Sequence, residues 1–518
     1  MLTVSKHFVW PLLVTGFLAL LGTWDMIQSR HNLLRNYPVI AHMRWLFEGI
    51  RPEFRQYFGE NDTSGRPFAR NQRTVVYERA KNLHGEQPFG TELEVYEPGY
   101  ELFLHSMSPK PQSKEHFRVP VGGPGCKRPY DMALLNVSAM SFGALSANAI
   151  RSLNLGAKMG DFCHDTGEGG LSQYHLEHGG DLVWEIGSGY FGCRTKEGGF
   201  DREQFKDKVN VDSVKLVSIK LSQGAKPGLG GVMPGPKVSP EIAAIRGVPV
   251  HEKCVSPPHH SAFSTPRELI EFVAELRDMA DGRPTGFKLC IGKMYEFLAV
   301  CKAMIETEVY PDFIIVDGSE GGTGAAPLEF EDHVGLPLTE GLVFVHNALV
   351  GCNLRDKIKI GCSGKVASGF DIARRIAQGA DYTNAARAMM FAIGCIQAQR
   401  CHTNRCPVGV ATQDHTRSRA LVVPDKAERV HQFQKNTVDS FNQILASLGL
   451  EHPDQLGPSF LQRRITHTRT VRFDEIYYYL KPGEILADTE HDFYKNAWEA
   501  ADPDSFEPRV EIVPTRTS

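Results

Sequence analysis

Three cysteines lie close together in the stretch GCIQAQRCHTNRCPVGVATQ, which runs from residue 394 to 413. Cys395, Cys401 and Cys406 are six and five residues apart, and Pro407 directly follows the last of them. Thiolates at this spacing in a loop can converge on one iron–sulfur cluster. A zinc ribbon would instead show a second CxxC pair, which is absent. From the spacing alone, three cysteines that bind no cluster are the other interpretation.

Other segments that could bind a ligand combine glycine with polar residues. They read MSFGALS at 140–146, TGEGG at 166–170, SQGAKPGLGGVMPG at 222–235 and GSEGGTG at 318–324. Small residues let backbone amides approach the edge of a flat ring. Taken alone, however, each segment is more simply an ordinary glycine turn.

These segments follow short apolar or β-branched runs, which alternate with helical patterns such as 266–279 and 370–378. The runs predict strands at 134–140, 161–166, 183–187, 216–220, 286–290, 313–317, 357–361 and 381–384. Eight strands in βα alternation predict an α/β fold, a closed (β/α)8 TIM barrel. The segments after the strands, the strand that bears Lys288, and the cysteine loop after the last strand are expected at one rim, where such barrels build their sites.

The string CHTNRCPVGVATQ, read together with MSFGALS, TGEGG, SQGAKPG and SPPHH, resembles the glutamate synthase large-subunit family over most of the chain. The resemblance implies an FMN-binding barrel and a [3Fe-4S] cluster held by Cys395, Cys401 and Cys406. It also implies an oxidoreductase acting on CH-NH2 donors. Electrons would pass through the cluster and FMN to a 2-imino acid, 2-iminoglutarate made from 2-oxoglutarate and ammonia.

The resemblance assigns roles to residues that match the motifs of the family. Residues expected to bind substrate or take part in catalysis are Glu168, Lys226, Arg246 and Lys288. Residues expected to bind FMN are Met140, Ser141, Gln223, Lys288, Gly321, Gly322, Thr323, Gly364, Lys365 and Arg387. The planar fork of Arg246 suits a dicarboxylate, and Glu168 is a candidate proton donor or organiser. His259 and His260 have two possible roles, as acid–base groups or in loop packing, and the sequence does not decide between them.

The chain departs from the family pattern in two places. Where the family has DGGL and FGT after the seventh and eighth strands, this chain has CSGK at 362–365 and AAR at 385–387, which predicts a different phosphate grip built on amides, Lys and Arg. Leu229 and Val232 replace a glutamate and a glutamine of the family. Because valine cannot make the hydrogen bonds of an amide, a related reaction on another amino or N-alkylamino acid is an alternative. A non-catalytic membrane electron-transfer subunit is a second.

The expected partners follow from two patterns that were not found in the sequence, one for a glutaminase and one for a dinucleotide. Met1 leads straight into a hydrophobic segment without a glutaminase pattern, and no GxGxxG follows an early strand. We therefore expect an external ferredoxin or NAD(P)H reductase subunit and a separate ammonia source. The net charge of −4 gives no reason to expect a nucleic acid. The odd number of cysteines, 11, fits a reducing compartment better than a disulfide framework.

The uncharged run from Phe8 to Trp24 predicts a single-pass membrane anchor, with a signal peptide and a buried or interfacial helix as the alternatives. Arginines outnumber acidic residues after it, which places the catalytic part in the cytoplasm. Residues 31–58, interrupted by Pro38, predict one or two amphipathic helices. They could lie on anionic lipid, but packing against the globular body is the favoured interpretation.

The expected domain order is an anchor, a juxtamembrane extension, the barrel with its cysteine loop, and a C-terminal extension, at 1–25, 26–115, 116–450 (loop 394–413) and 451–518. Short strand-like pieces are predicted outside the barrel at 74–77, 93–96 and 476–480.

Overall fold

The computed structural model describes residues 6–83 and 86–510, and its contacts divide the chain into two compact units, Met1–Arg70 and Asn71–Ser518. The first unit contains α1 (Lys6–Ile27), α2 (Asn32–Asn36), α3 (His42–Phe54) and the π-helical turn η1 (Arg55–Gly59). Within the described residues, one helix, over Phe8–Ile27, is long and apolar enough to cross a membrane. The amphipathic helices predicted over 31–58 are present as α2 and α3, with Pro38 between them.

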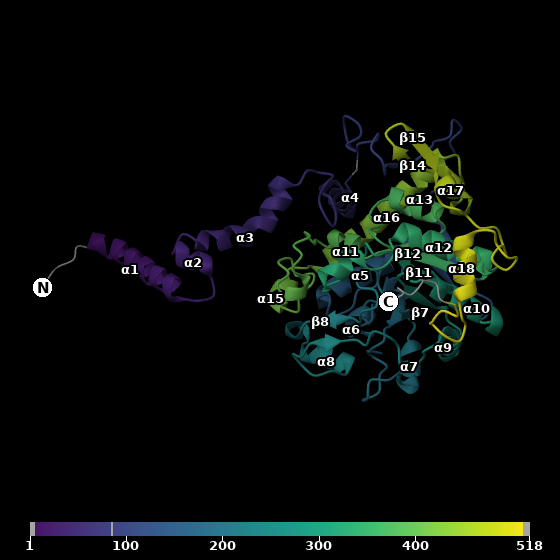
Figure 1. Ribbon diagram of the computed structural model, residues 1–518, viewed down its shortest axis with the longest axis horizontal. Helices are drawn as coiled ribbons and strands as arrows, with labels where there is room; N and C mark the ends of the chain where they lie inside the picture. Colours follow the sequence, from purple (N-terminus) through teal and green to yellow (C-terminus); the bar gives the residue numbers. More distant parts are fainter. Residues whose placement is uncertain (1–5, 84–85, 511–518) are drawn as a thin grey trace, which may run out of the picture. The chain divides into compact units, whose positions relative to one another are not determined.

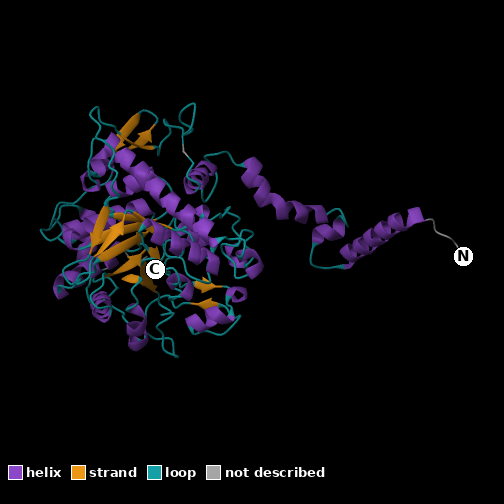
Figure 2. Ribbon diagram, turned by 180° about the vertical axis from the view of Figure 1, so that it is seen from behind, coloured by secondary structure: helices purple, strands orange, loops and turns teal. Residues whose placement is uncertain are grey.

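Among the described residues of the second unit, eight parallel strands close into a barrel in the order β4-β5-β6-β7-β10-β11-β12-β13. They are β4 (Leu135–Val137), β5 (His164–Asp165), β6 (Leu182–Ile186), β7 (Val214–Lys220), β10 (Thr285–Leu289), β11 (Phe313–Asp317), β12 (Lys359–Ser363) and β13 (Tyr382–Ala385). Figure 2 shows the strands in orange among purple helices. The predicted TIM barrel is confirmed, and each strand overlaps one of the eight runs read from the sequence.

Helices cover the outside of the barrel. They include α5 (Ala147–Gly160), α7 (Arg202–Val209), α9 (Pro266–Met279), α10 (Met294–Thr307), α12 (Leu338–Gly351), α13 (Gly369–Ala377) and α16 (Val423–Ser447). In α9, the Thr265 hydroxyl accepts the Glu268 N–H (3.1 Å) and Pro266 takes the first helical position, as expected of a helix start. Leu269 and Leu276 are buried on its inner face.

One end of the barrel is closed by an antiparallel hairpin of β2 (Arg118–Val121) and β3 (Tyr130–Ala133). Side chains from the hairpin join barrel side chains in one buried cluster, which contains Val121, Met132, Cys163, Val183, Leu216, Phe313, Ile315 and Tyr382. These apolar side chains fill the barrel around the starts and middles of its strands. The carboxyl ends are therefore left for polar residues.

Smaller elements extend from the barrel. Between β7 and α9 lie β8 (Val232–Met233), α8 (Pro240–Arg246) and β9 (Cys254–Val255), and an outer sheet pairs β1 (Glu101–Phe103), β14 (Leu461–Thr466) and β15 (Arg469–Arg472). Figure 1 labels α16 close to α5, and the two helices pack together. The remaining helices are α4 (Arg70–Ala80), α6 (Gln173–Leu176), α11 (Leu328–His333), α14 (Arg387–Ala392), α15 (His415–Ser418), α17 (Phe473–Ile476) and α18 (Asp492–Ala500). Single helical turns occur at Gly235–Lys237, Arg355–Lys357, Cys401–Thr403, Pro453–Gln455 and Pro458–Phe460.

The strands predicted outside the barrel are wrong. Residues 74–77 belong to helix α4, residues 93–96 form a loop, and residues 476–480 end α17 and continue as a loop. In α4 the buried residues are Arg73, Val76 and Ala80. This is helical spacing, so packing of one face overrides the strand propensity of the valines.

Candidate functional site

Charged and polar residues lie next to one another at the carboxyl ends of neighbouring strands. In the register of the barrel, Lys288 of β10 lies beside Lys220 of β7, and Asp317 of β11 lies beside Ser363 of β12. Asp317 accepts hydrogen bonds from the Ser363 hydroxyl (2.5 Å) and from the Gly224 backbone N–H (2.7 Å). The rim predicted from the sequence is therefore a connected polar surface.

Lys288 is buried and forms a direct ion pair with Glu185 of β6. Burial alone would lower the pKa of Lys288, but Glu185, Asp165 and Asp317 raise it overall. Burial and the Glu185 carboxylate in turn raise the pKa of Asp165, whose side chain accepts the Gly167 N–H (2.9 Å). Lys288 thus stays cationic inside the barrel mouth. Glu185 and Asp165 were not predicted as site residues from the sequence.

Glu168 lies in the loop after β5 and pairs with a lysine that the sequence analysis also missed. Lys220 Nζ is 3.1 Å from Glu168 Oε1 and donates to Gln223 Oε1 at 2.6 Å. Burial would raise the pKa of Glu168, but Lys220, Arg246 and Lys226 lower it overall. The carboxylate is therefore held in its ionised form. Lys220 could have been predicted as a site residue from its position at the carboxyl end of β7.

Arg246 ends helix α8 and points back to the loop after β4. Its guanidinium lies 4.9 Å from the centre of the Phe191 ring and donates to Ser141 Oγ (3.3 Å) and to the Phe142 carbonyl (3.4 Å). The side chain is 5% exposed, and its Nε finds no hydrogen-bond partner among the described residues. A buried guanidinium with an unused donor is suited to receive an anion.

Lys226 enters the same region from the loop after β7. Its Nζ donates to the Ala325 carbonyl (3.0 Å), which joins this loop to the one after β11. Burial, and next the neighbouring charge of Lys220, lower the pKa of Lys226 to about 8. Leu229, three residues on, is 37% exposed, and Val232 is partly buried at the start of β8. The two residues that depart from the family pattern thus lie in the same loop as Lys226.

The two glycine-containing loops expected to border FMN lie against each other. Gly167 has a φ of +62°, and a Cβ added there would come within 2.8 Å of the Ser141 backbone nitrogen. A Cβ on Gly169 would lie 2.7 Å from Ser141 Cβ. Met140 is buried beside them. Only glycines permit so close a packing of the two loops. The two loops predicted to border FMN are therefore neighbours in space.

The expected phosphate residues also meet in space. A Cβ on Gly322 would lie 2.9 Å from the Arg387 guanidinium, which donates to the Glu320 carbonyl at 2.6 Å. A Cβ on Gly364 would meet the Glu320 carboxyl carbon at 3.4 Å, and Lys365 follows with a φ of +53°. Gly321 and Thr323 belong to the same loop as Gly322. Two cations and several glycine amides fit a phosphate.

The cysteine loop is joined to the loop after β4. Lys237, which is 2% exposed, donates to the Ala144 carbonyl (2.7 Å) and to the Cys401 carbonyl (3.3 Å). Gln413 Nε2 donates to the carbonyls of Gly143 (3.0 Å) and Leu145 (2.9 Å). The loop predicted to carry a cluster therefore contacts the loop predicted to carry a flavin.

The three cysteines are free thiols and near neighbours. Burial raises the pKa of Cys395 to about 12, with smaller contributions from Cys401 and Cys406, and the Cys395 sulfur accepts the Gln397 N–H at 3.5 Å. Among residues 6–83 and 86–510, no three His, Cys, Asp or Glu side chains are arranged to hold a metal ion. Three thiols in one loop are the kind of donor that an iron–sulfur cluster uses, but in this structure they are not gathered into a ligand group.

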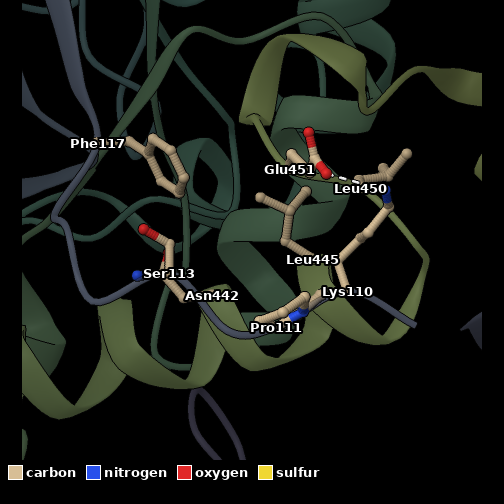
Figure 3. Close-up of a pocket in the computed structure, with 9 residues that line it drawn as sticks. Lys110, Pro111, Ser113, Phe117, Asn442, Leu445, Leu450 and Glu451 are labelled. Atoms are coloured by element: carbon tan, nitrogen blue, oxygen red, sulfur yellow. Dashed lines mark ion pairs between the residues drawn. The ribbon is translucent and has the colours of Figure 1, made fainter.

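A cavity of about 260 Å³ lies elsewhere, between residues 110–117 and the end of α16. Figure 3 shows the Lys110–Glu451 ion pair (2.9 Å) at its edge, with Phe117 and Leu445 among the lining side chains. No residue assigned to substrate, FMN or the cluster lines this cavity. It is therefore separate from the candidate site.

The chain is a (β/α)8-barrel protein. The carboxyl rim of its barrel combines buried cations with glycine-rich loops. The conserved region of glutamate synthase matches residues 130–451. The glutamate synthase large subunit-like protein YerD of Bacillus subtilis (strain 168) is 38% identical over 470 residues, which cover 83% of this chain and 89% of that protein. The chain belongs to the glutamate synthase family of oxidoreductases.

More distant relatives match a smaller part. The archaeal glutamate synthase (NADPH) of Methanocaldococcus jannaschii is 32% identical over 321 residues, which cover 62% of this chain and 60% of that protein. The archaeal-type enzyme of Thermotoga neapolitana gives the same identity and coverage over 322 residues. Among solved structures, a flavocytochrome b2 variant with benzoylformate has a TM-score of 0.43 at 13% identity, over 85% of this chain and 91% of that one.

Proposed function

We propose that this protein is a glutamate synthase-type oxidoreductase that reduces 2-iminoglutarate, formed from 2-oxoglutarate and ammonia, to glutamate. The observation that carries the proposal is that two buried cations, Arg246 and Lys226, lie near one carboxylate, that of Glu168. Both side chains lie close enough to Glu168 to lower its pKa, and Arg246 keeps an unused Nε donor among the described residues. Buried cations need anionic partners, and a dicarboxylate supplies one for each.

In this proposal FMN supplies the hydride for the imine carbon. The residues that hold it are Met140, Ser141, Gln223, Lys288, Gly321, Gly322, Thr323, Gly364, Lys365 and Arg387. Lys288, kept cationic by Glu185, gives a fixed positive charge to stabilise negative charge that develops in the site. Glu168, kept ionised, positions Lys220 and Gln223, so we assign it the role of organiser rather than proton donor.

We assign Cys395, Cys401 and Cys406 as the ligands of a [3Fe-4S] cluster, which would supply one-electron transfer. The donor is external, a ferredoxin or an NAD(P)H reductase subunit, and ammonia comes from a separate source. Lys237 and Gln413 hold the cysteine loop against the loop after β4. These contacts keep the proposed donor and acceptor sites adjacent without placing a ligand residue in the substrate pocket.

We further propose that α1 is a single-pass membrane anchor and that the barrel lies in the cytoplasm. The length and apolar character of Phe8–Ile27 support the anchor, and the excess of arginine after it supports the orientation. The functional parts are then the anchor (1–25), a juxtamembrane extension (26–115), the catalytic barrel with its cysteine loop (116–450) and a C-terminal extension (451–518).

A second candidate function is favoured by one observation. Leu229 and Val232 offer apolar surface where the family pattern has a carboxylate and an amide, and they lie three and six residues after Lys226. An amino acid with an apolar N-substituent would suit that surface better than ammonia-derived 2-iminoglutarate. The barrel, the cofactors and the carboxylate-binding role of Arg246 are the same in both candidates.

The test is product formation by the full chain with bound FMN, a chemical reductant, ammonia and 2-oxoglutarate. The proposal predicts glutamate. Product only when methylamine replaces ammonia would select the second candidate, and no product with either amine would reject both substrate assignments.

The pKa of Lys226 predicts how substrate binding depends on pH. Because its pKa is about 8 in the free protein, Lys226 is protonated below that pH and can pair with a carboxylate. The affinity for 2-oxoglutarate should be flat below pH 8 and fall by about tenfold per pH unit above it. Calorimetric titration from pH 6.5 to 9.5 checks this. Lys226→Gln should bind weakly with no bend near pH 8; a bend that persists in this variant contradicts the assignment.

The proposed phosphate grip predicts that Lys365→Ala weakens FMN binding by about 10- to 100-fold, since a charge-assisted contact to phosphate is lost. The dissociation constant is measured by flavin fluorescence during reconstitution. Lys359→Ala, at the start of β12, the strand that precedes Lys365, is the matched control and should leave the affinity unchanged. Unchanged affinity in Lys365→Ala would exclude this lysine from the grip.

A further inference from the structure

Helix α3 and the turn η1 carry an exposed apolar face within the described part of the first unit. We call it the α3 apolar face; its members are Met43, Leu46, Phe47, Ile50, Phe54, Tyr57 and Phe58. The five that belong to α3 recur at the i, i+3, i+4, i+7 and i+11 positions, which places them on one side of the helix. Tyr57 and Phe58 follow in η1. Their exposure ranges from 36% for Ile50 to 82% for Phe58, and α3 contains no buried residue.

Arginines line one edge of this face. Arg44, Arg51 and Arg55 repeat at i, i+7 and i+11, so they form a strip along the helix; all three are exposed, and Arg55 pairs with Glu60 at 3.0 Å. The acidic residues of α3 lie elsewhere on its surface, with Glu48 away from the face and Glu53 at the opposite edge. Apolar and aromatic side chains with arginines beside them are typical of a helix lying in the headgroup region of an anionic bilayer.

The start of the face is tied to the end of α1. Asp25, near the end of α1, is buried and accepts hydrogen bonds from the Val39 backbone N–H (2.8 Å) and from His42 Nε2 (2.9 Å). His42 is the first residue of α3. If α1 crosses the bilayer, this contact puts the beginning of α3 at the level where α1 leaves it.

We propose that the α3 apolar face lies in the surface of an anionic phospholipid bilayer, as an in-plane helix next to the anchor. The inference rests on the proposed membrane role of α1, and it adds a second lipid contact of different orientation. A transmembrane helix alone leaves the chain free to pivot about its exit point. An in-plane helix fixed to it by Asp25 restricts that motion and holds the following residues near the membrane surface.

The test measures the depth of two neighbouring positions with tryptophan fluorescence. The background protein is the full chain with Trp10, Trp24 and Trp45 replaced by phenylalanine, reconstituted into vesicles of phosphatidylcholine and phosphatidylglycerol with brominated acyl chains. Phe47→Trp places a probe on the face, and Glu48→Trp is the matched control, about 100° around the helix. The signal of the background protein, which keeps Trp184 and Trp498, is subtracted.

We expect bromine to quench the Phe47→Trp probe at least threefold more than the Glu48→Trp probe. Equal quenching of the two probes, or no quenching of the first, overturns the proposal, because the α3 apolar face is then not the side of the helix that enters the bilayer. Restoring Trp10 reports on α1 separately. Quenching of Trp10 without quenching of Phe47→Trp leaves the anchor standing and rejects only the in-plane helix. Quenching of neither rejects both.

The role of the anionic lipid is tested separately. In vesicles of phosphatidylcholine alone, the quenching of the Phe47→Trp probe should fall by at least half, because the arginine strip loses its counter-charge. Unchanged quenching rejects the role given to Arg44, Arg51 and Arg55.

Discussion

Arg246→Met is expected to reduce kcat/KM for the oxo acid by about 1,000-fold, which corresponds to ~4 kcal/mol of lost transition-state binding. The methionine keeps much of the packing against Phe191 but removes every donor that could reach a carboxylate. The cation is nearly fully buried, so water cannot replace it. Steady-state kinetics with a saturating reductant measure the effect, and flavin absorbance shows whether the barrel is still loaded.

Arg151→Met is the matched control for this change. Arg151 also stacks on an aromatic ring, Tyr174 at 4.5 Å, and pairs with Glu177 at 2.7 Å, but it lies on helix α5 outside the barrel. Its kcat/KM should stay within about twofold of the parent. Arg246→Lys should recover only part of the activity, because lysine keeps the charge without the fork. If kcat/KM of Arg246→Met equals that of the parent protein, Arg246 does not bind a substrate carboxylate.

Cys406→Ala is expected to abolish the iron–sulfur centre and to slow turnover driven by an external protein donor by at least about 100-fold. Three ligands are the minimum for a [3Fe-4S] cluster held by thiolates alone, so the loss of one leaves the cluster open. Iron and sulfide assays and the electron paramagnetic resonance signal of the oxidised protein measure the first effect. FMN content should be unchanged, since Cys406 does not belong to the proposed flavin site.

Cys126→Ala is the control for that variant. Cys126 is also a free cysteine, and its thiol donates only to the Gly282 carbonyl (3.3 Å) outside the cysteine loop. Iron content equal to the parent is expected here. Equal iron content in Cys406→Ala would exclude this residue as a ligand and leave the cysteine trio without a role.

The barrel was predictable because its signals are local. Most of the strands lie in short apolar runs followed by a segment that contains glycine or polar residues, and the run around Phe313 coincides with the observed strand β11. The failure at α4 has a physical cause. Its Thr-Val-Val-Tyr sequence favours a strand by propensity, whereas burial of Val76 and Ala80 on one helical face decides the structure.

The site was only partly predictable, for a different reason. Motifs indicated Glu168, Arg246 and Lys288, but not the partners that set their charge. Lys220 and Glu185 become neighbours of those residues only when the barrel closes and brings β6, β7 and β10 side by side. The contact of Lys237 with the cysteine loop spans an even longer stretch of sequence. Pairwise contacts of this kind depend on register, which a single sequence does not reveal.

A single-turnover experiment tests directly whether reduced flavin in this protein converts 2-oxoglutarate and ammonia to glutamate. The full chain, loaded with FMN and reduced under anaerobic conditions, is mixed with 2-oxoglutarate and ammonia in a stopped-flow spectrophotometer. We expect flavin absorbance to return with one glutamate formed per flavin reoxidised, and Arg246→Met to slow this return by about 1,000-fold. Flavin that remains reduced in the presence of 2-oxoglutarate with either ammonia or methylamine would contradict it.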